Sequence, residues 1–486
     1  MKKLVLCVAF PLAAMAQNPV GQMIIGDNDD DRMGQSCALS NDGSILAIGS
    51  SYHDGAGADA GMVRVYTNMG GTWTAMGNDI NGLVAGDRFG TSMSISGDGN
   101  ILAVATPFSD VGGNNTGQVR VFEYSNNNWI QKGSTLNGMA ANDAFGTDVA
   151  LSDDGTHLVV GGPYNDGNAS NSGHARVYQF TNGEWAQVGA DIQGKGSNNN
   201  TGESVAISAD GSTVAVGSPA NGTMGSFAGL ARVFKYTNGS WTQQGADIYG
   251  QNAGDWSGES VELSYDDSVV MIAGRSAGAG AGQIRLFTYS NNTWTQKGSD
   301  LNGEAAGDFS GWSTSLSANG NIVAIGAVGN DGNGQSSGHV RVYSFFGTDW
   351  IQVGADIDGA QANDACGSAA SLSADGTILA VGTYRYGIPN DTVKPGSVQV
   401  WDLTTPLANR NEVATGLAVY PQPAVDFVNI ETTSGTLESV SLYNTRGEHV
   451  LTSYEAQLKL QDIASGLYIL QLETSEGVYR QKLIIQ

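Results

Sequence analysis

The chain is poor in cysteine, proline and histidine for its length. Its 486 residues include three cysteines, ten prolines and five histidines. Cys7 lies in an N-terminal apolar stretch, so Cys37 and Cys366 are the thiols of the remaining chain. Two thiols supply neither a disulfide framework nor a four-ligand zinc set. Buried free thiols are the expected state, and a bond between the two is the alternative.

Positive charge is also scarce. Lys and Arg total 22 against 47 Asp and Glu, which gives a formal net charge of −25. Nucleic acid and anionic membrane surfaces attract clustered Lys and Arg, so neither is an expected partner. The acidity favours solubility and is compatible with cations or basic partners. A solvated surface of a secreted protein is the simpler interpretation.

Long hydrophobic runs are missing except at the start of the chain. Lys2 and Lys3 precede the apolar stretch Leu4 to Ala13, which is too short to span a bilayer. The small residues around Ala16 are typical of a secretory cleavage site. Residues 1–16 are therefore predicted to be a signal peptide that is cut before Gln17, and no membrane span is expected.

Glycine is abundant, with 69 residues, and it marks an internal repeat. Six tryptophans recur at spacings of 56, 56, 56, 53 and 56 residues: Trp73, Trp129, Trp185, Trp241, Trp294 and Trp350. Seven marker glycines share this period and the same short unit: Gly34, Gly90, Gly146, Gly202, Gly258, Gly311 and Gly367. Two registers with one period establish seven copies of one unit.

The third copy shows what each unit contains. Short β-type segments lie at 149–152, 158–161 and 175–178, and a fourth is predicted from Trp185 to Ile192. Tight Asp-Gly or Asn-Gly turns join some of them, and a long polar loop joins the second to the third. Four antiparallel strands repeated in series are typical of propeller blades, and closing the ring removes exposed sheet edges.

The sequence therefore predicts an all-β fold with a seven-bladed propeller at residues 17–403. The Trp-bearing fourth strand occurs only six times, and the last copy ends near Trp401. The segment Val20 to Gly26 stands where a fourth strand should precede the first copy. We expect it to complete the last blade and close the ring, which also brings Cys37 and Cys366 into adjoining blades.

A short motif recurs at the start of two copies. Phe89-Gly90 precedes Ala105-Thr106-Pro107, and Phe145-Gly146 precedes Gly161-Gly162-Pro163. In these motifs the repeat resembles the FG-GAP family, known from integrin α-chain propellers and bacterial surface proteins. The resemblance implies the propeller fold and an extracellular binding role. Many family members bind calcium in an Asp-rich turn, but the turn around Asp154 lacks the other oxygen ligands.

A polar linker is predicted at 404–416, and a different domain follows at 417–486. This domain resembles the type A sorting domain of the type IX secretion system of Bacteroidetes. The resemblance rests on these residues: Tyr420, Pro421, Pro423, Gly447, Gly466, Tyr468 and Lys482. It implies a small β-sandwich that the secretion machinery binds, and display at the cell surface after passage through the periplasm. A sandwich retained for adhesion is the alternative.

Two sets of aspartates recur in the long loops, which should share one end of the ring. One set precedes the marker glycines: Asp31, Asp87, Asp143, Asp255, Asp308 and Asp364, with Asn199 in the seventh place. The other set is a metal candidate, with calcium as the cofactor to consider: Asp54, Asp110, Asp166 and Asp331. The alternative is that each carboxylate caps its own turn by accepting backbone N–H groups.

Six arginines also share a register: Arg64, Arg120, Arg176, Arg232, Arg285 and Arg341. Uninterrupted hairpin pairing would place Arg176 opposite Gly189, with Asp191 as its diagonal neighbour. The glycine would then make room for the guanidinium group. This pattern predicts a structural contact rather than a site.

No catalytic residues are predicted, because the chain lacks a nucleophile elbow, a zinc-protease helix and a phosphate loop. Ligand-binding candidates are residues that break the repeat: Tyr384, Arg385, Tyr386 and Trp256. We expect a monomeric, surface-displayed binding or adhesion module whose partner is an extracellular glycan or protein. The alternatives are a carbohydrate-active enzyme that uses the same loops and a surface coat protein without a specific ligand.

Overall fold

A computed structural model describes residues 17–388, 393–404, 417–420, 424, 426–432, 436–444, 449–461, 463–464, 466–474 and 477–485. The predicted signal peptide 1–16, including Ala16, lies outside these residues, as does most of the predicted linker. The chain forms two compact units, which are described separately. One comprises residues 1–406 without 345–347, and the other comprises 407–486 with 345–347.

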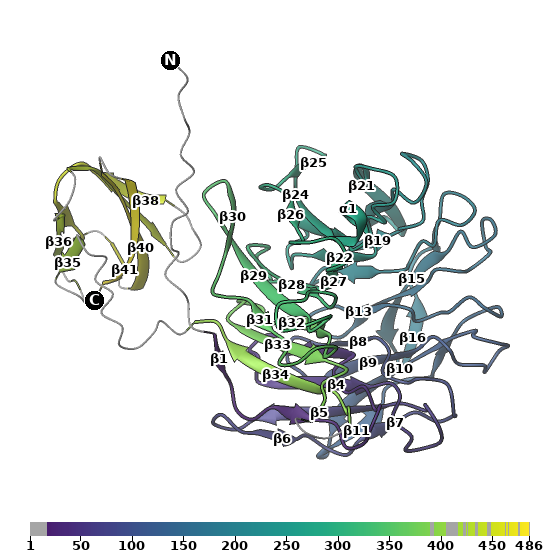
Figure 1. The fold of residues 1–486 in the computed structure, drawn as a ribbon. Helices are drawn as coiled ribbons and strands as arrows, with labels where there is room; N and C mark the ends of the chain where they lie inside the picture. The colour runs from purple at the N-terminus through teal and green to yellow at the C-terminus, as the bar shows by residue number, and fades with distance from the viewer. Residues whose placement is uncertain are drawn as a thin grey trace. The chain divides into compact units, whose positions relative to one another are not determined.

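The first unit contains seven antiparallel sheets, named here sheets 1 to 7 in chain order (Figure 1). Sheet 1 contains β3 (Ser36–Leu39), β4 (Ile45–Ser50), β5 (Met62–Asn68), β6 (Trp73–Ala75) and β7 (Ile80–Asn81). Sheet 2 contains β8 (Met93–Ile95), β9 (Ile101–Thr106), β10 (Gln118–Ser125), β11 (Asn128–Gln131) and β12 (Leu136–Asn137). Sheet 3 contains β13 (Val149–Leu151), β14 (His157–Gly162), β15 (His174–Thr181), β16 (Glu184–Gln187) and β17 (Ile192–Gln193).

The remaining sheets repeat this order. Sheet 4 contains β18 (Val205–Ile207), β19 (Thr213–Gly217), β20 (Leu230–Thr237) and β21 (Ser240–Tyr249). Sheet 5 contains β22 (Ser260–Leu263), β23 (Val269–Gly274), β24 (Gln283–Ser290), β25 (Thr293–Gln296) and β26 (Leu301–Asn302), with the short turn α1 (Ala277–Gly280) before β24. Sheet 6 contains β27 (Ser310–Leu316), β28 (Ile322–Ala327), β29 (His339–Phe346), β30 (Asp349–Gln352) and β31 (Ile357–Asp358). Sheet 7 contains β32 (Cys366–Leu372), β33 (Ile378–Thr383) and β34 (Ser397–Asp402), with β1 (Asn18–Pro19) and β2 (Ile24–Ile25).

The N-terminal segment completes sheet 7, as the sequence predicted. Asn18 lies opposite Asp402 in the β1–β34 pair, and Ile24 lies opposite Val398 in the β2–β34 pair. Sheet 7 also packs on sheet 1, where one core cluster joins Leu46 and Val398. Figure 1 shows the first strands of the unit beside the last ones. The first and last sheets are therefore neighbours, and the array closes on itself.

The outer strand differs from the prediction in the sheets other than sheet 4, where β21 is one continuous strand. The segment from Trp185 to Ile192 is two strands, β16 and β17, separated by a bulge, and β17 places Ile192 opposite Ala175. Gly189 lies in the bulge with φ +69°, and a Cβ there would meet the Trp241 ring at 2.8 Å. The prediction that Arg176 faces this glycine is wrong, because the glycine makes room for the tryptophan of the next sheet.

Each of the six repeated tryptophans links its sheet to the preceding one. The Trp241 indole N–H donates to the Val188 carbonyl at 2.9 Å, and four other tryptophans repeat this bond between sheets. The first of the six, Trp73, donates to Val20 at 2.9 Å, in the N-terminal segment. At the junction of sheets 6 and 7, the Gln17 amide donates to the Val353 carbonyl at 3.4 Å. The predicted first residue of the mature chain thus occupies the register of the six tryptophans.

The repeated arginines make two kinds of contact, one within a sheet and one between neighbouring sheets. Arg176 binds Asp191 through two hydrogen bonds, of 2.8 and 2.6 Å, and Arg64 binds Asp79 in the same manner. The other four donate to backbone carbonyls of the preceding sheet: Arg120 to Asn81, Arg232 to Gln193, Arg285 to Tyr249 and Arg341 to Asn302. All six therefore hold the scaffold together.

The innermost strands surround the axis with small side chains, and two acids interrupt this pattern. The Asp148 carboxylate accepts bonds from Ser92 of sheet 2 and Ser204 of sheet 4, at 3.1 and 3.0 Å. Glu262 stands in the register of Ser94 and Ser315, whose hydroxyls accept backbone N–H groups of the next sheet. Burial, followed by the charge of Asp148, raises the pKa of Glu262 to about 8.

The second unit consists of two antiparallel sheets that share a core. The three-stranded sheet contains β35 (Leu417–Tyr420), β36 (Phe427–Thr432) and β39 (Gln457–Lys459). The four-stranded sheet contains β37 (Leu437–Asn444), β38 (His449–Ser453), β40 (Gly466–Thr474) and β41 (Gly477–Ile485). Val428 and Leu458 of the first pack with Val440 and Leu470 of the second. This is the predicted β-sandwich.

Cys37 and Cys366 are free thiols. Burial raises the pKa of each thiol to about 12, so both stay protonated. No helix in the described parts of the chain is long and apolar enough to cross a membrane.

Candidate functional site

The long loops form one end of the propeller unit, called here the loop face. It comprises the loops after the second strand of each sheet and the segments that enter the next sheet. Isolated parallel bridges tie the two sets together, as between Gly117 and Phe145 and between Gly229 and Ser257. The scaffold therefore holds side chains of neighbouring sheets next to one another on this face.

Seven residues form a ring on the loop face, two positions before each marker glycine. All seven have a left-handed backbone with φ between 50° and 57°: Arg32, Arg88, Ala144, Asn200, Trp256, Phe309 and Ala365. This conformation is uncommon outside glycine, asparagine and aspartate, and it is a genuine outlier for a bulky side chain. Backbone strain of this kind concentrates at functional sites. The left-handed backbone of the arginines, the tryptophan and the phenylalanine in this ring therefore needs an explanation.

The backbone of the preceding loop imposes the strained conformation. The Trp256 N–H donates to the Phe227 carbonyl at 2.9 Å, and the Asn200 N–H makes the equivalent bond to Asn171 at 3.2 Å. Phe227 and Asn171 are themselves left-handed, with φ 54° and 46°. Asparagine suits both positions, so sheets 3 and 4 show what the scaffold alone prefers.

Phe227 and Trp256 replace that asparagine pair with an aromatic platform. Their rings stack with centroids 4.8 Å apart and an interplanar angle of 4°. Phe227 is 44% exposed, and Trp256 is partly exposed. A flat, exposed pair of rings in strained backbone positions offers a surface for an apolar ligand face.

Arginine and aromatic side chains alternate on the side of sheets 1 and 2. The Arg32 guanidinium lies 3.6 Å from the Tyr52 ring centroid, and Arg88 lies 4.4 Å from the same ring. Arg88 also lies 5.1 Å from Phe108, which is 38% exposed. These distances are within the range of cation–π attraction. Arg32 and Arg88, with Tyr52 and Phe108, are called here the arginine ladder. Both arginines are partly exposed, so their N–H groups can donate hydrogen bonds to a ligand.

Carboxylates lie on the side of sheets 4 and 5. Glu259 receives two bonds from Arg275, from the backbone N–H at 3.0 Å and from Nε at 3.1 Å. Arg275 in turn lies 4.5 Å from the Trp312 ring, which is 39% exposed. Glu203 occupies the same register one sheet earlier. Burial raises the pKa of Glu203 to about 7, and the charges of Glu259 and Asp148 add to that rise.

The other predicted ligand-binding residues lie in sheet 7. Tyr384 and Arg385 follow β33, with the Arg385 guanidinium 5.0 Å from the Tyr384 ring. The Tyr386 N–H donates to the Thr383 carbonyl at 2.9 Å. Tyr384 is also near Arg32: burial opposes the charge on Arg32, but bonding to Asp30 and the nearby phenols raise its pKa overall. Residues 384–386 therefore extend the arginine ladder, whereas Trp256 belongs to the aromatic platform.

Nine of the ten aspartates in the two repeated sets accept a backbone N–H group of their own loop, and the tenth, Asp87, lies next to the Ser109 side chain. In the metal-candidate set, one carboxylate oxygen accepts the N–H five residues later: Asp54 from Asp59, Asp110 from Asn115, Asp166 from Asn171 and Asp331 from Ser336. In the other set, Asp143 accepts from Ala140 at 3.0 Å and Asp308 accepts from Ala305 at 2.9 Å. These bonds are the turn-capping contacts given as the alternative, and calcium remains an untested expectation.

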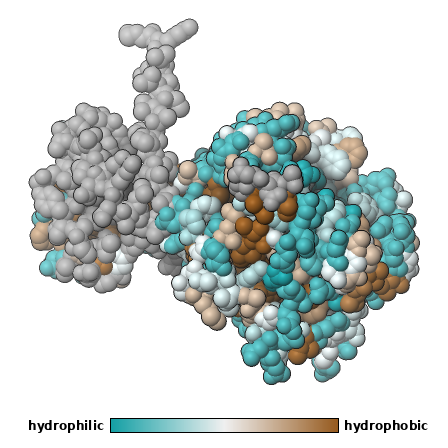
Figure 2. All heavy atoms as spheres, turned by 60° about the horizontal axis from the view of Figure 1, so that its bottom comes forward, coloured by the Kyte–Doolittle hydropathy of each residue, from teal (hydrophilic) through white to brown (hydrophobic). Residues whose placement is uncertain are grey.

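The sequence patterns did not predict Phe227, Glu203 or Arg88 as residues of the loop face. Aligning the seven copies on the marker glycines places Glu203 beside Glu259 and Arg88 beside Arg32, in registers that vary among the copies. A hollow of about 210 Å³ lies elsewhere, beside Arg232 and Trp241 at the outer strands. Scaffold residues line it, so it is not the candidate site. Figure 2 shows hydrophobic side chains in small separate groups on a largely hydrophilic surface.

Comparison with known proteins finds one family match within each of the two units. Residues 418–486 match the secretion system C-terminal sorting domain, and residues 135–178 match the FG-GAP repeat. The crystal structure of RRP9 WD40 repeats is similar at 14% identity with a TM-score of 0.48, over 80% of this chain and 99% of that one. No curated protein matches.

The sorting domain marks the chain for export by the type IX secretion system to the cell surface or extracellular space. The structure places Tyr420 at the end of β35, Gly466 at the start of β40 and Lys482 within β41. The Tyr468 hydroxyl donates to the Ala464 carbonyl at 2.8 Å. Pro421, Pro423 and Gly447 lie outside the described residues.

Proposed function

We propose that this chain is an extracellular glycan-binding module whose ligand lies on the loop face of the propeller. The observation that carries the proposal is the Phe227–Trp256 platform, in which two stacked aromatic residues both have a left-handed backbone. The Phe227 position carries an aspartate or asparagine in sheets 1 to 3: Asp59, Asn115 and Asn171. A strained and partly exposed aromatic pair contributes little to folding. Its position is explained if it contacts a ligand.

Glycan chemistry fits the groups around the platform. Sugar rings present apolar C–H faces that stack on aromatic rings, and hydroxyls that bond to charged side chains. The loop face supplies both kinds of group, with the platform, the arginine ladder at Arg32 and Arg88, and the carboxylates Glu203 and Glu259. Export through the sorting domain brings this face to where extracellular polysaccharide is present.

A glycan array tests the proposal. The full chain should bind a restricted set of glycans, and the paired substitution Phe227→Asn with Trp256→Asn should abolish that binding. A matched control changes an aromatic of the arginine side, Phe108→Asn, and should alter affinity by less than the platform variant. Selective binding to matrix proteins instead of glycans, or unchanged glycan binding by the platform variant, would contradict the proposal.

A second candidate is a carbohydrate-active enzyme. Glu203 and Glu259 stand in the same register of adjacent sheets, and only Glu259 is held by an arginine. Two carboxyl groups in different environments are the usual requirement for glycoside hydrolysis. Release of reducing sugar from a polysaccharide panel, lost in Glu203→Gln, would favour the enzyme over the binding module.

A further inference from the structure

His339 is a buried histidine without a hydrogen-bond partner. It begins β29 in sheet 6, is 1% exposed, and neither ring nitrogen has a hydrogen bond among the described residues. Its Nδ1 lies 3.5 Å from Oδ2 of Asp356, a contact that lacks hydrogen-bond geometry. Buried polar groups in folded proteins nearly always have partners, so this ring requires an explanation.

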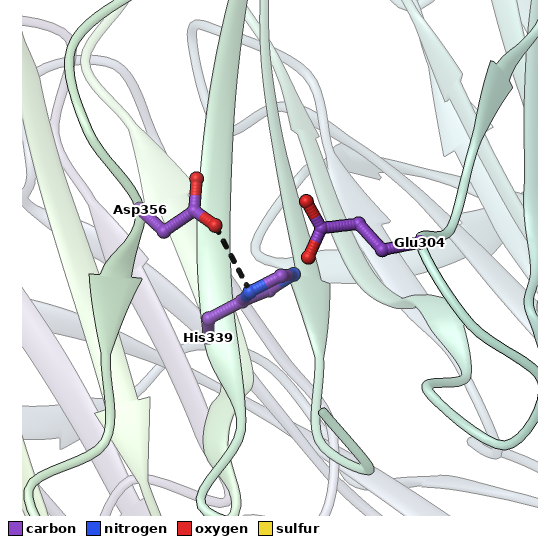
Figure 3. A group of neighbouring side chains, drawn as sticks. All are labelled: Glu304, His339 and Asp356. Carbon is purple, nitrogen blue, oxygen red and sulfur yellow. Dashed lines mark ion pairs between the residues drawn. The ribbon is translucent and has the colours of Figure 1, made fainter. Parts of the chain in front are cut away.

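Two carboxylates flank the ring (Figure 3). Asp356 precedes β31 of the same sheet, whereas Glu304 follows β26 of sheet 5. One ligand atom from each of Glu304, His339 and Asp356 lies within 4.8 Å of the others. Figure 3 shows the imidazole between the two carboxyl groups. Asp358, which lies opposite His339 in the sheet, adds a third negative charge close by.

The neighbouring contacts occupy only part of each carboxylate. Gln352 donates to Oδ1 of Asp356 at 2.6 Å, so Oδ2 remains toward the histidine. Arg341 donates to the Asn302 carbonyl at 2.9 Å and forms an ion pair with Oε1 of Glu304 at 3.5 Å. Asn330 donates a hydrogen bond of 3.4 Å to the other Glu304 oxygen, and each carboxylate oxygen has a second lone pair for a ligand. Glu304 is exposed, which gives an ion a path from solvent.

Sheet 3 provides an internal comparison. His174 occupies the register of His339, is equally buried, and also has no hydrogen bond on either nitrogen among the described residues. Its aspartate, Asp191, is bound at both oxygens by Arg176. Met139 stands where sheet 6 has Glu304. Sheet 3 therefore has the histidine alone, and sheet 6 adds a free carboxylate oxygen and a second acid.

We infer that His339, Asp356 and Glu304 form a binding site for a first-row divalent cation, zinc foremost, that ties sheet 5 to sheet 6. One imidazole nitrogen and two carboxylate oxygens suit zinc and related metals, whereas calcium takes oxygen ligands alone. Zinc bonds of about 2.0–2.2 Å require the three groups to move closer together, which the exposed Glu304 side chain can do by rotation.

Titration calorimetry on the untagged full chain tests the inference, after treatment with a chelator and dialysis. Zinc sulfate should bind with one equivalent per chain that calcium chloride does not reproduce. Glu304→Met, which copies sheet 3, and His339→Gln should each weaken that equivalent by about tenfold or more. His174→Gln removes an equally buried histidine and should leave it unchanged.

Each other result counts against the site. Absence of a tight equivalent in the wild-type chain, its retention in Glu304→Met, or its loss in His174→Gln would overturn the inference. Because Glu304 is exposed, its variant does not depend on repacking the core. If His339→Gln does not fold, the zinc titration of Glu304→Met still decides whether the site exists.

Discussion

The aromatic platform gives the sharpest prediction, because binding and folding should respond differently to its removal. The perturbation is Phe227→Asn with Trp256→Asn, which grafts the residue pair that sheets 3 and 4 carry at Asn171 and Asn200. Removing the backbone strain of two bulky left-handed residues should raise the free energy of unfolding by about 1 kcal/mol for each residue. Loss of the stacked pair should cost about 0.5–1.5 kcal/mol, together with the burial of two half-exposed rings.

These contributions oppose one another, so the free energy of unfolding should change by less than about 1 kcal/mol. Rings that packed a core would instead cost about 3–5 kcal/mol each on truncation. Urea denaturation followed by tryptophan fluorescence is the assay. All nine tryptophans lie at or before Trp401, so the signal follows the propeller and not the sorting domain.

A scaffold pair provides the control. Tyr236 and Trp241 also contact each other, with centroids 5.1 Å apart, and Trp241 donates its N–H to sheet 3. Changing both to asparagine should lower stability by several kcal/mol. If the Phe227 and Trp256 variant lost as much stability as this control, the platform would be a packing element, and the reasoning that assigns it to a ligand would fail.

Three further predictions follow from the scaffold. Glu262 has a pKa of about 8 in the folded chain against an ordinary 4.5, so the stability from its bound proton is complete below about pH 4.5 and is lost as pH rises through 8. In urea titrations, the free energy of unfolding of Glu262→Gln should therefore match that of the wild type at pH 4 and exceed it at pH 9. The same pH dependence in both proteins would contradict the assignment. Trp185→Phe keeps an aromatic side chain but removes part of the buried indole and its bond to the Lys132 carbonyl, and should cost at least about 1 kcal/mol in the same assay. Deletion of residues 417–486 should retain the protein in the cell envelope, as measured by cell fractionation, whereas normal surface display would refute the sorting role.

Sequence periodicity predicts the propeller well, because every blade must bury the same faces against its neighbours. The spacing of Trp73 to Trp350 and of the marker glycines therefore predicts the number of repeats, the order of their strands and the missing outer strand. The bulge at Gly189 was not predicted, since it depends on contact with Trp241 of the next sheet. The two residues belong to different repeats, so the sequence of a single repeat does not reveal their contact.

The functional residues were predicted less completely, for a related reason. Trp256 was found because it breaks the repeat, but its partner Phe227 lies in a loop that varies between copies. The sequence does not distinguish His339 from His174, because the two histidines share one register of the repeat. Two residues distinguish the site at His339 from the one at His174. Glu304 comes from the preceding sheet, and Asp356 keeps one oxygen toward the histidine because Arg341 bonds to the Asn302 carbonyl instead. Contacts across sheet junctions join residues far apart in sequence.

The closed ring is the claim on which the loop face depends, and an engineered disulfide tests it directly. Asn18 and Asp402 lie opposite each other in the β1–β34 pair, where Cα separations near 5.5 Å suit a disulfide. In the chain with Asn18→Cys and Asp402→Cys, mild oxidation should form an intramolecular bond that changes mobility on a non-reducing gel. Failure of the two thiols to react with each other, while the protein remains folded, would contradict closure by the N-terminal segment.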